Sequence, residues 1–307
     1  MARKRYCPDA RAATVSGRRT RLPTPNLTFV VRSLRNAAHL PLVAMTAEAT
    51  TTWGVGDYAL IAERLEPAAR AVVDLAGVSD SDRVLDVATG TGNAALLAAS
   101  RGATVVGLDF EPRLLDIARG RASSANLEVE WVLADVESAP FEPAAFSAVV
   151  SAFGVMYAPD HAAAARALAS YCAPGARLAL AAWTPGSFMP AMGAALAPYL
   201  PPPPPGGAPP SRWGDEAAVA ELLERHGIST RTATSESLSL SLPDRAAAVN
   251  FLIRTAGHVV SEQPRLQREG RWEQLRADLA ALVAARDEGG DGVELRCEYL
   301  VVVAART

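Results

Sequence analysis

The segment Val84–Gly92 limits the possible folds of this chain most strongly. Apolar residues up to Val87 are typical of a buried strand, and an alanine- and leucine-rich helical pattern begins directly after Gly92. Gly90 and Gly92 allow a tight turn and let a ligand approach the backbone closely. The start of the following helix presents unpaired N–H groups that attract an anionic group. The segment therefore predicts a strand–loop–helix unit that binds a ligand at the carboxyl end of the strand.

Strand and helix patterns alternate along most of the chain, which predicts a parallel sheet covered by helices on both faces. Strands are expected at 83–87, 104–108, 127–133, 146–151, 177–183, 235–242 and 293–304, and helices at 92–100, 112–121, 161–171, 216–225, 244–257 and 271–286. A helical pattern from Asp57 to Gly77 is interrupted at Pro67. The expected fold class is α/β, a Rossmann-like, seven-stranded, mostly parallel sheet with helices on both faces and an inserted helical cap over its carboxyl edge.

Acidic residues follow three of these strands. Asp109, at the end of the second strand, can accept hydrogen bonds from both hydroxyls of a ribose. The pattern Gly90-x-Gly92-x-x-Ala95 also fits dinucleotide binding, so a nicotinamide or flavin enzyme is an alternative. Asp86, however, is unfavourable beside a pyrophosphate and suits the ammonium of a methionine moiety, and Asp135 can accept a hydrogen bond from an adenine amino group. Together the three acids indicate adenosine attached to an amino acid; their alternative role is to cap helices and loops.

Five segments resemble the motifs of class I S-adenosylmethionine (SAM)-dependent methyltransferases of the type 11 group, which includes the ubiquinone and menaquinone biosynthesis methyltransferases. They are Val84–Asn93, Val105–Arg119, Asp135–Phe141, Phe146–Tyr157 and Arg166–Trp183. The resemblance covers residues 53–185 well and the closing strand weakly. It departs from the family pattern at Ala88 and Thr89, where many members have Gly or Cys, and at Ala176, where they have a second Gly after Pro-Gly.

The resemblance implies S-adenosyl-L-methionine as the cofactor and assigns the parts of its site. The two glycines would line the methionine moiety, Asp109 the ribose, and Asp135 with Val136 the adenine. Phe110 would pack on the adenine or in the core, and Tyr58 would be a lid contact or a plain aromatic anchor. The expected cofactor contacts are Tyr58, Asp86, Ala88, Gly90, Gly92, Asp109, Phe110, Asp135, Val136, Ser151 and Phe153.

No dedicated catalytic motif is required. The resemblance also implies that Ser151 and Phe153 close the pocket beside the sulfonium. In-line displacement there needs aligned reactants more than acid–base chemistry. If the acceptor is a hydroxyl, a base accelerates the transfer, and the candidates are Tyr157, His161 and His258. The sequence has no clustered His, Asp and Glu set beyond the acids assigned to SAM, so no metal is expected.

The acceptor pocket is expected under the cap that follows Trp183. Apolar residues gather in two short stretches of the cap, and some of them are expected to face the cleft near Phe153 and Tyr157. These residues are Phe188, Met189, Met192, Phe251, Leu252 and Ile253. A cap of this kind would exclude water from the reacting groups.

The expected organisation has five parts. A disordered basic extension (1–44) precedes N-terminal helices and a lid (45–80), the SAM-binding core (81–185), the helical cap with the sixth strand at about 230–242 (186–292) and the closing strand (293–307). Nine basic residues but only one acid, Asp9, precede Met45, which is a candidate start of translation. The extension is expected to be dispensable for folding and SAM binding.

The predicted activity is methyl transfer from SAM to a small-molecule acceptor by direct in-line displacement. The acidic remainder of the chain, and Ser-Ala-Phe-Gly in place of Asn/Asp-Pro-Pro-Tyr/Phe after the fourth strand, argue against nucleic acid. Because no apolar run approaches the roughly 18 residues of a membrane span, and the three cysteines are far apart, no membrane contact is expected and the cytoplasm is the expected location. The alternatives are a methyltransferase fold that binds SAM but acts as a cyclase or binding module and, less favoured, a nicotinamide-dependent reductase.

Overall fold

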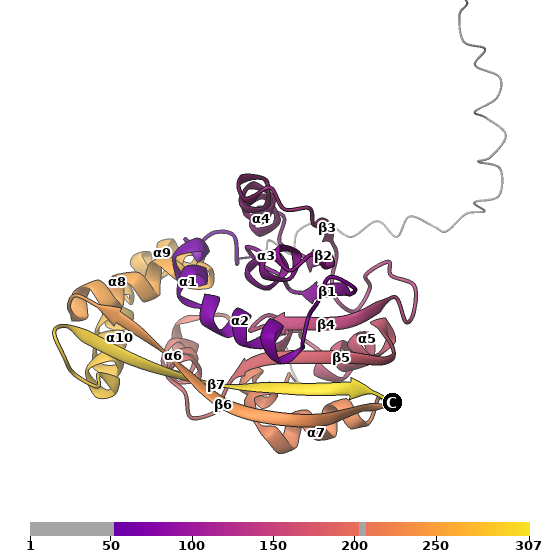
Figure 1. Cartoon of the computed structure of the whole chain (residues 1–307). Coiled ribbons are helices and arrows are strands. Elements are labelled where there is room, and N and C mark those ends of the chain that lie inside the picture. Colours follow the sequence, from indigo (N-terminus) through magenta and orange to yellow (C-terminus); the bar gives the residue numbers. More distant parts are fainter. Residues whose placement is uncertain (1–51, 203–206) are drawn as a thin grey trace, which may run out of the picture. The chain divides into compact units, whose positions relative to one another are not determined.

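The computed structural model describes residues 52–202 and 207–307. The expectations for residues 1–44 and for Met45 lie outside the described residues. Seven strands form one sheet in the order β3-β2-β1-β4-β5-β7-β6 (Figure 1). They are β1 (Arg83–Val87), β2 (Thr104–Asp109), β3 (Glu130–Leu133), β4 (Phe146–Ala152), β5 (Cys172–Trp183), β6 (Ile228–Leu242) and β7 (Val293–Arg306).

Strand direction places several strand ends at one edge of the sheet. β1 pairs in parallel with β2 and β4, β2 with β3, and β4 with β5, whereas β7 runs antiparallel to β5 and β6. The predicted α/β class with seven mostly parallel strands is therefore confirmed. Val84, Leu85 and Val87 are fully buried, as expected for a parallel strand that is covered on both faces. The carboxyl ends of β1 to β5 consequently lie along a single edge.

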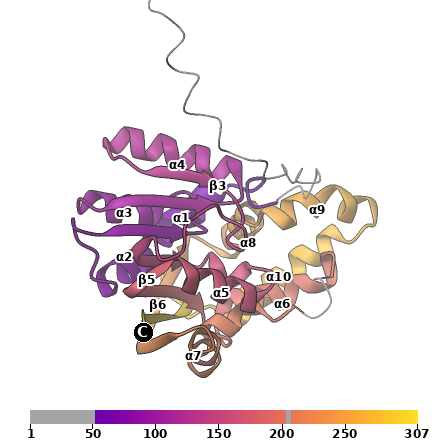
Figure 2. The same cartoon turned by 90° about the vertical axis from the view of Figure 1, so that its right-hand side faces the viewer.

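Helices cover both faces of this sheet (Figure 2). On one face α2 (Glu66–Leu75) lies over β4 and β5 and packs against α3 (Asn93–Ser100), and α4 (Pro112–Ala125) lies against β2 and β3. On the other face of the sheet, α5 (His161–Tyr171) lies against β4 and β5 and contacts α7 (Glu216–Glu224), which covers β6. None of the helices within the described ranges is long and apolar enough to cross a membrane.

The cap lies beside the carboxyl edge of the sheet (Figure 1). It comprises α6 (Phe188–Leu196), α8 (Arg245–Thr255), α9 (Gly257–Arg268) and α10 (Trp272–Arg286), and α1 (Tyr58–Arg64) packs against α8. The prediction that all helices inserted after β5 join the cap does not hold for α7, because its apolar face packs on β6 and α5. Helix α9 was not predicted, since few of its residues are buried and Pro264 lies inside it.

Several element boundaries differ from the prediction. β6 begins at Ile228, close to the start of about 230 expected for the sixth strand of the cap and seven residues before the alternating pattern at Ser235, because its polar first half pairs with β7. β5 likewise begins at Cys172, whereas β3 is shorter than expected and begins at Glu130. α4 continues to Ala125, past the expected end at 121, and stops where the next residue adopts a left-handed conformation.

The apolar residues of the cap mostly form its core. Phe188, Met192, Leu252 and Ile253 are buried. Neither the cavity beside the glycine loop nor the larger cavity next to α5 is lined by any of the six residues predicted to face the cleft. The expectation that a subset lines the acceptor pocket is therefore not supported at these two cavities, because these side chains satisfy the packing of the cap itself.

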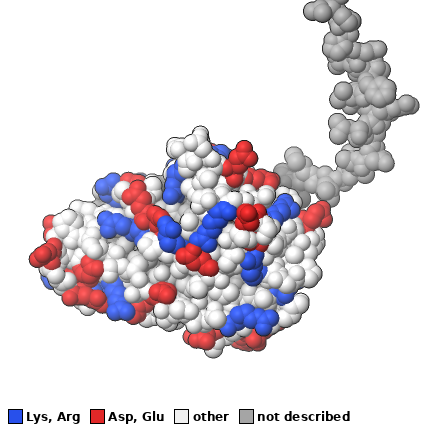
Figure 3. All heavy atoms as spheres, in the orientation of Figure 1, with Lys and Arg blue, Asp and Glu red and all other residues white. Residues whose placement is uncertain are grey.

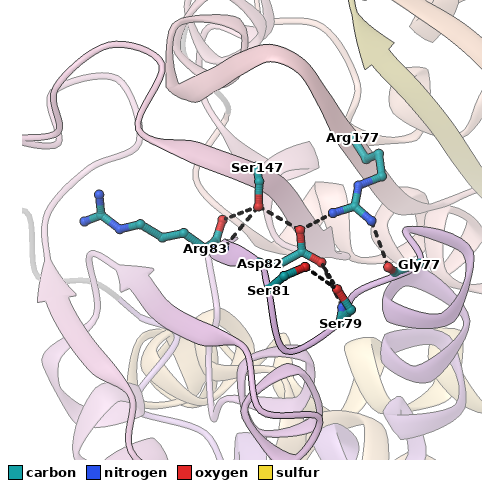
Figure 4. Close-up of polar contacts among 7 residues, drawn as sticks. All are labelled: Gly77, Ser79, Ser81, Asp82, Arg83, Ser147 and Arg177. Atoms are coloured by element: carbon teal, nitrogen blue, oxygen red, sulfur yellow. Dashed lines mark hydrogen bonds and ion pairs between the residues drawn. The ribbon is translucent and has the colours of Figure 1, made fainter.

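Asp82 joins four elements at the opposite, amino edge of the sheet (Figure 4). This carboxylate is 6% exposed and accepts hydrogen bonds from the Ser147 hydroxyl (2.8 Å) and the Ser79 N–H (2.8 Å). It also pairs with Arg177, whose guanidinium donates to the carbonyl of Gly77 (2.8 Å). Burial alone would raise the pKa of Asp82, but these hydrogen bonds and the charge of Arg177 outweigh burial and hold the pKa below its usual value.

We expect Asp82→Asn to lower the free energy of unfolding by about 1–3 kcal/mol, because buried donors lose their charged acceptor. Since the folded-state pKa is depressed, the stabilisation is complete above the pKa of an unfolded aspartate, about 3.9. It is lost as the pH falls through the lower folded-state pKa. Urea unfolding at neutral and acidic pH measures both effects. The matched control is Asp80→Asn, which alters an exposed acid two residues earlier; equal losses in the two variants would contradict the assignment.

Candidate functional site

The loop between β1 and α3 turns sharply. Gly90 and Gly92 have φ angles of +55° and +86°, and Ala88 has a φ of +52°. A left-handed alanine stores backbone strain, which persists only where surrounding contacts hold it. One such contact is the hydrogen bond from the N–H of Thr89 to the carbonyl of Leu108 on β2 (2.9 Å). The loop is therefore tied to the neighbouring strand.

Asp86, the acid at the end of β1, is 2% exposed and supports the same loop. Its Oδ2 accepts hydrogen bonds from the Thr89 hydroxyl (2.6 Å) and the N–H of Ala95 (2.9 Å). The side chain lines a small cavity of about 20 Å³ together with Tyr58 and Ala88. Burial raises the pKa of Asp86 to about 7, against the opposing effect of these hydrogen bonds. A cation placed beside this carboxyl group would favour its ionised form.

Asp109 ends β2 and is 5% exposed. Its Oδ2 accepts from the N–H of Gly90 (2.8 Å) and its Oδ1 from the N–H of Glu111 (2.9 Å). Burial raises the pKa of Asp109, although both hydrogen bonds oppose the rise. Glu111 is also buried and accepts from the N–H groups of Gly54 (3.3 Å) and Arg113 (3.1 Å). At the end of β2, Asp109 therefore binds the glycine loop and Glu111 binds Gly54 in the N-terminal segment. The role of Glu111 was not predicted from the sequence.

The ends of β2 and β3 carry the three residues expected around an adenine. Asp135 is exposed, and its Oδ1 accepts from the N–H of Glu137 (2.8 Å). Val136 is half-buried, and its carbonyl accepts from the Tyr171 hydroxyl (2.6 Å). Phe110 is 43% exposed, so its ring is not a core residue. An accessible ring and an accessible carboxylate thus lie on neighbouring strand ends.

The side chains of Ser151 and Phe153 make their contacts within the carboxyl edge of the sheet. The buried Ser151 hydroxyl donates to the carbonyl of Val87 (2.7 Å) and accepts from the N–H of Val155 (3.1 Å). Phe153 has a φ of +61° and stacks on Trp183, with ring centroids 3.7 Å apart. Both side chains are buried, so they shape the edge of the sheet on which the site is built.

Four aromatic side chains from three distant segments meet above the glycine loop. We call Trp53, Tyr58, Tyr157 and His258 the aromatic cluster. The Trp53 ring lies 6.3 Å from Tyr58, 4.8 Å from Tyr157 and 6.4 Å from His258 between centroids. The Tyr58 ring lies 3.5 Å from the position that a Cβ on Gly90 would occupy. The cluster therefore reaches the loop directly, and Trp53 at its centre was not among the expected cofactor contacts.

Burial sets the protonation of this cluster. It moves the pKa of the half-buried Tyr58 well above its usual value, and partial desolvation raises the pKa of Tyr157 as well, although 41% of that residue is exposed. Burial also lowers the pKa of His258. At neutral pH both phenols therefore keep their protons and the imidazole is uncharged.

The structure separates the three candidate catalytic residues. Tyr157 and His258 both contact Trp53 in the aromatic cluster. His161, the first residue of α5, is instead buried with its ring 5.7 Å from that of Trp213. His161 consequently lies against a different aromatic neighbour and outside the cluster.

Residues 52–57, which we call the strap, are held from two sides. On the side of the core, the Arg113 guanidinium donates to the carbonyl of Gly54 (3.3 Å). On the side of the cap, the N–H of Asp57 donates to the carbonyl of Arg254 (2.8 Å), and their side chains form an ion pair (3.0 Å). The strap thus links the end of β2 to the cap across the site.

A network centred on Arg121 of α4 fixes the second half of the glycine loop. Its Nη1 donates to the carbonyl of Thr91 (2.6 Å) and to Oδ1 of Asn93 (2.8 Å). Nδ2 of Asn93 donates in turn to the carbonyl of Ala62 on α1 (2.7 Å). Helix α1 also carries Tyr58, so one arginine positions both the loop and the helix that covers it. No sequence motif marked this residue.

Arg121→Ala is expected to weaken SAM binding by about tenfold, because the loop and α1 lose a shared, charge-assisted anchor. Isothermal titration calorimetry measures the affinity. Arg119→Ala is the matched control, since Arg119 lies on the same helix, is exposed and pairs only with Asp116 among the described residues. An unchanged affinity in a folded Arg121→Ala protein, or the same loss in both variants, would contradict the positioning role.

The chain matches known proteins in sequence. A family model described as a methyltransferase domain matches residues 84–175. The uncharacterized protein Rv1405c of Mycobacterium tuberculosis is 42% identical over 172 residues, which are 56% of this chain and 63% of that relative. The match therefore spans less than two thirds of its length. The demethylmenaquinone methyltransferase of Thermus thermophilus is 44% identical over 118 residues, 38% of this chain and 54% of that enzyme.

The fold has solved counterparts as well. YcgJ of Bacillus subtilis has a TM-score of 0.57 at 13% identity, over 78% of this chain and 98% of that one. At this level of identity the likeness concerns the fold alone. The methyltransferase domain model, the matching relative and the seven-stranded fold agree with the motifs of the glycine loop. The chain therefore contains a methyltransferase domain, and at the level of this domain the predicted class I SAM-dependent methyltransferase of the type 11 group, with S-adenosyl-L-methionine as its cofactor, is confirmed.

Proposed function

We propose that this chain transfers the methyl group of SAM to a small acceptor whose flat, apolar part binds against the aromatic cluster. The observation that carries the proposal is the position of Tyr58, whose ring lies over Gly90 while Trp53 joins it to Tyr157 and His258. Aromatic walls favour flat or apolar ligands, and aromatic faces attract a cation such as a sulfonium. An acceptor at the cluster would therefore lie next to the methyl donor.

SAM is proposed to bind along the carboxyl ends of β1, β2 and β3. Oδ1 of Asp86 has no hydrogen-bond partner in the described part of the chain and is the proposed acceptor for the ammonium. Asp109 is the proposed partner of the ribose hydroxyls. Asp135 and Val136 are proposed to face the adenine edge, and the exposed ring of Phe110 its face.

The proposed reaction is an in-line displacement in which the acceptor attacks the methyl carbon and the carbon–sulfur bond breaks. Alignment of the two reactants supplies most of the acceleration, about 7–11 kcal/mol in well-oriented systems. S-adenosylhomocysteine leaves with the electron pair of the broken bond. If the acceptor atom is a hydroxyl oxygen, its proton passes to His258, which the lowered pKa keeps neutral and able to accept it. Tyr157 remains protonated and serves as a hydrogen-bond donor.

Surface charge supports a small molecule as the acceptor. On the face drawn in Figure 3, basic and acidic side chains of the described residues are interspersed. Such a surface exerts little net attraction on the polyanionic backbone of a nucleic acid. The substrate named for the Thermus thermophilus relative, demethylmenaquinone, is flat and apolar and is a suitable first probe.

A methyltransferase fold that binds SAM but acts as a cyclase or binding module is the alternative. Formation of S-adenosylhomocysteine discriminates between the two functions. The proposed function requires its release in a screen of reduced naphthoquinones and small aromatic hydroxy compounds. Tight SAM binding with no S-adenosylhomocysteine from any acceptor would favour the alternative.

The affinity for SAM is expected to rise by about tenfold between about pH 5.5 and pH 7. Burial raises the pKa of Asp86 to about 7, so only the higher pH supplies the carboxylate that attracts the ammonium, which keeps its proton over this range. Calorimetry across the range measures the rise. Asp86→Asn should bind more weakly and without this pH dependence, whereas Asp116→Asn, an exposed acid on α4, should behave as the unaltered protein. A flat profile for the unaltered protein would remove Asp86 from the site.

His258→Gln is expected to lower kcat by about 10²–10⁴-fold with a hydroxyl acceptor, because the transfer loses its base. SAM affinity should stay unchanged, since His258 belongs to the acceptor side of the aromatic cluster. The control is His226→Gln, a histidine next to the end of α7. Release of S-adenosylhomocysteine from an acceptor found in the screen provides the readout. Full activity of His258→Gln at neutral pH would rule out the proposed base.

A further inference from the structure

A second cavity opens on the far side of Tyr157. It has a volume of about 850 Å³ and lies between the short helix η1 (Val155–Tyr157), the start of α5 and a second short helix, η3 (Pro210–Gly214). Most of its wall is apolar, and the charged residues that line it are Asp160, Arg212 and Arg225. Because Tyr157 also contacts Trp53, the cavity adjoins the aromatic cluster. Tyr157 therefore lines this cavity and also belongs to the aromatic cluster.

Arg212 belongs to η3, a short helix of the cavity wall that packs tightly against the core. Its neighbour Trp213 is fully buried, and η3 packs against β5 and η1. A Cβ on Gly214 would lie 2.0 Å from the carbonyl oxygen of Trp183, so η3 approaches β5 as closely as a backbone can. The N–H of Arg212 donates to the carbonyl of Pro209 (2.9 Å). The position of its backbone is therefore set by the core and does not depend on a ligand.

The other charged groups around the cavity already have partners. Asp160 caps α5 by accepting hydrogen bonds from the N–H groups of Ala162 and Ala163 (2.9 and 3.0 Å). Arg225 pairs with Glu221 on α7. Arg212 is half-buried and has no ion-pair partner among residues 52–202 and 207–307.

His161 adds no competing charge to this wall. Burial lowers the pKa of His161, and the positive charge of Arg212 lowers it further, against the opposing effect of Asp160. The imidazole is therefore neutral at pH 7. Among the described residues, Arg212 is therefore the cation in the lining of this cavity that has no ion-pair partner.

We propose that this cavity binds the acceptor's carboxylate tail, with Arg212 as its partner and the apolar body of the acceptor directed past Tyr157 toward the methyl donor. A guanidinium matches a planar carboxylate with two parallel hydrogen bonds. Because Arg225 is paired with Glu221, Arg212 alone offers its guanidinium here, which suits this monoanion better than a phosphate, whose three oxygens usually engage several donors. The proposal rests on the proposed function, because it names the class of acceptor for the same site.

Binding of three small probes tests the inference without turnover. They are 3-(4-hydroxyphenyl)propionate, its methyl ester and 4-hydroxyphenyl phosphate, each titrated into the full-length protein with SAM present. The carboxylate should bind about tenfold or more tightly than the ester. Arg212→Gln should abolish this preference and leave SAM affinity unchanged, whereas Arg119→Gln, a distant exposed arginine, should retain it.

Equal affinity for the carboxylate and the ester, or no binding of either at millimolar concentration, would overturn the proposal. A preference that survives in Arg212→Gln would overturn the role of this residue, and tighter binding of the phosphate would overturn the choice of carboxylate. S-adenosylhomocysteine release is measured separately. A carboxylate preference without methyl transfer would contradict the proposed function, and methyl transfer without the preference would contradict only this inference.

Discussion

Two buried carboxylates determine the geometry of the whole site. Asp86 and Asp109 end neighbouring strands, and a buried charge is costly unless donors satisfy it. Here the donors come from the glycine loop and the first turn of α3, namely the Thr89 hydroxyl and the N–H groups of Gly90 and Ala95. The acids and the loop therefore stabilise one another. The strained turn at Ala88, the position of Tyr58 and the aromatic cluster above it all depend on a loop that has its shape before a ligand arrives.

The strap connects the glycine loop and its two acids to the cap. Glu111 follows Asp109 by two residues and holds Gly54, while Asp57 pairs with Arg254 of α8. At the junction with α9 the backbones nearly touch, since a Cβ on Gly257 would lie 1.8 Å from the carbonyl oxygen of Thr52. The segment that carries Trp53 is thus placed by the core and the cap together, and this placement brings Tyr157 and His258 to the same indole ring.

Local signals allowed the central part of the fold to be predicted. Helix α5 runs over the predicted range because Asp160 caps its first turn, and the glycine loop follows β1 where the apolar run ends. The start of β6 was predicted only approximately and all of α9 was missed, because a polar strand is held by its pairing with β7 and a polar helix by only a few buried contacts. The same distinction applies to the site. Asp86 and Asp109 could be placed from strand ends, whereas Glu111 and Arg121 act on residues 57 and 30 positions away along the chain.

The strap and Tyr58 also control access to the proposed SAM site. With Tyr58 over Gly90, the cavity beside Asp86 is about 20 Å³, which is room for about one water molecule. A methionine moiety in the proposed site therefore requires Tyr58 and the strap to move away. Under the proposed function each cycle would bring one fresh donor in and take one spent donor out, so the frequency with which the strap opens would set a ceiling on turnover, however fast the displacement itself becomes.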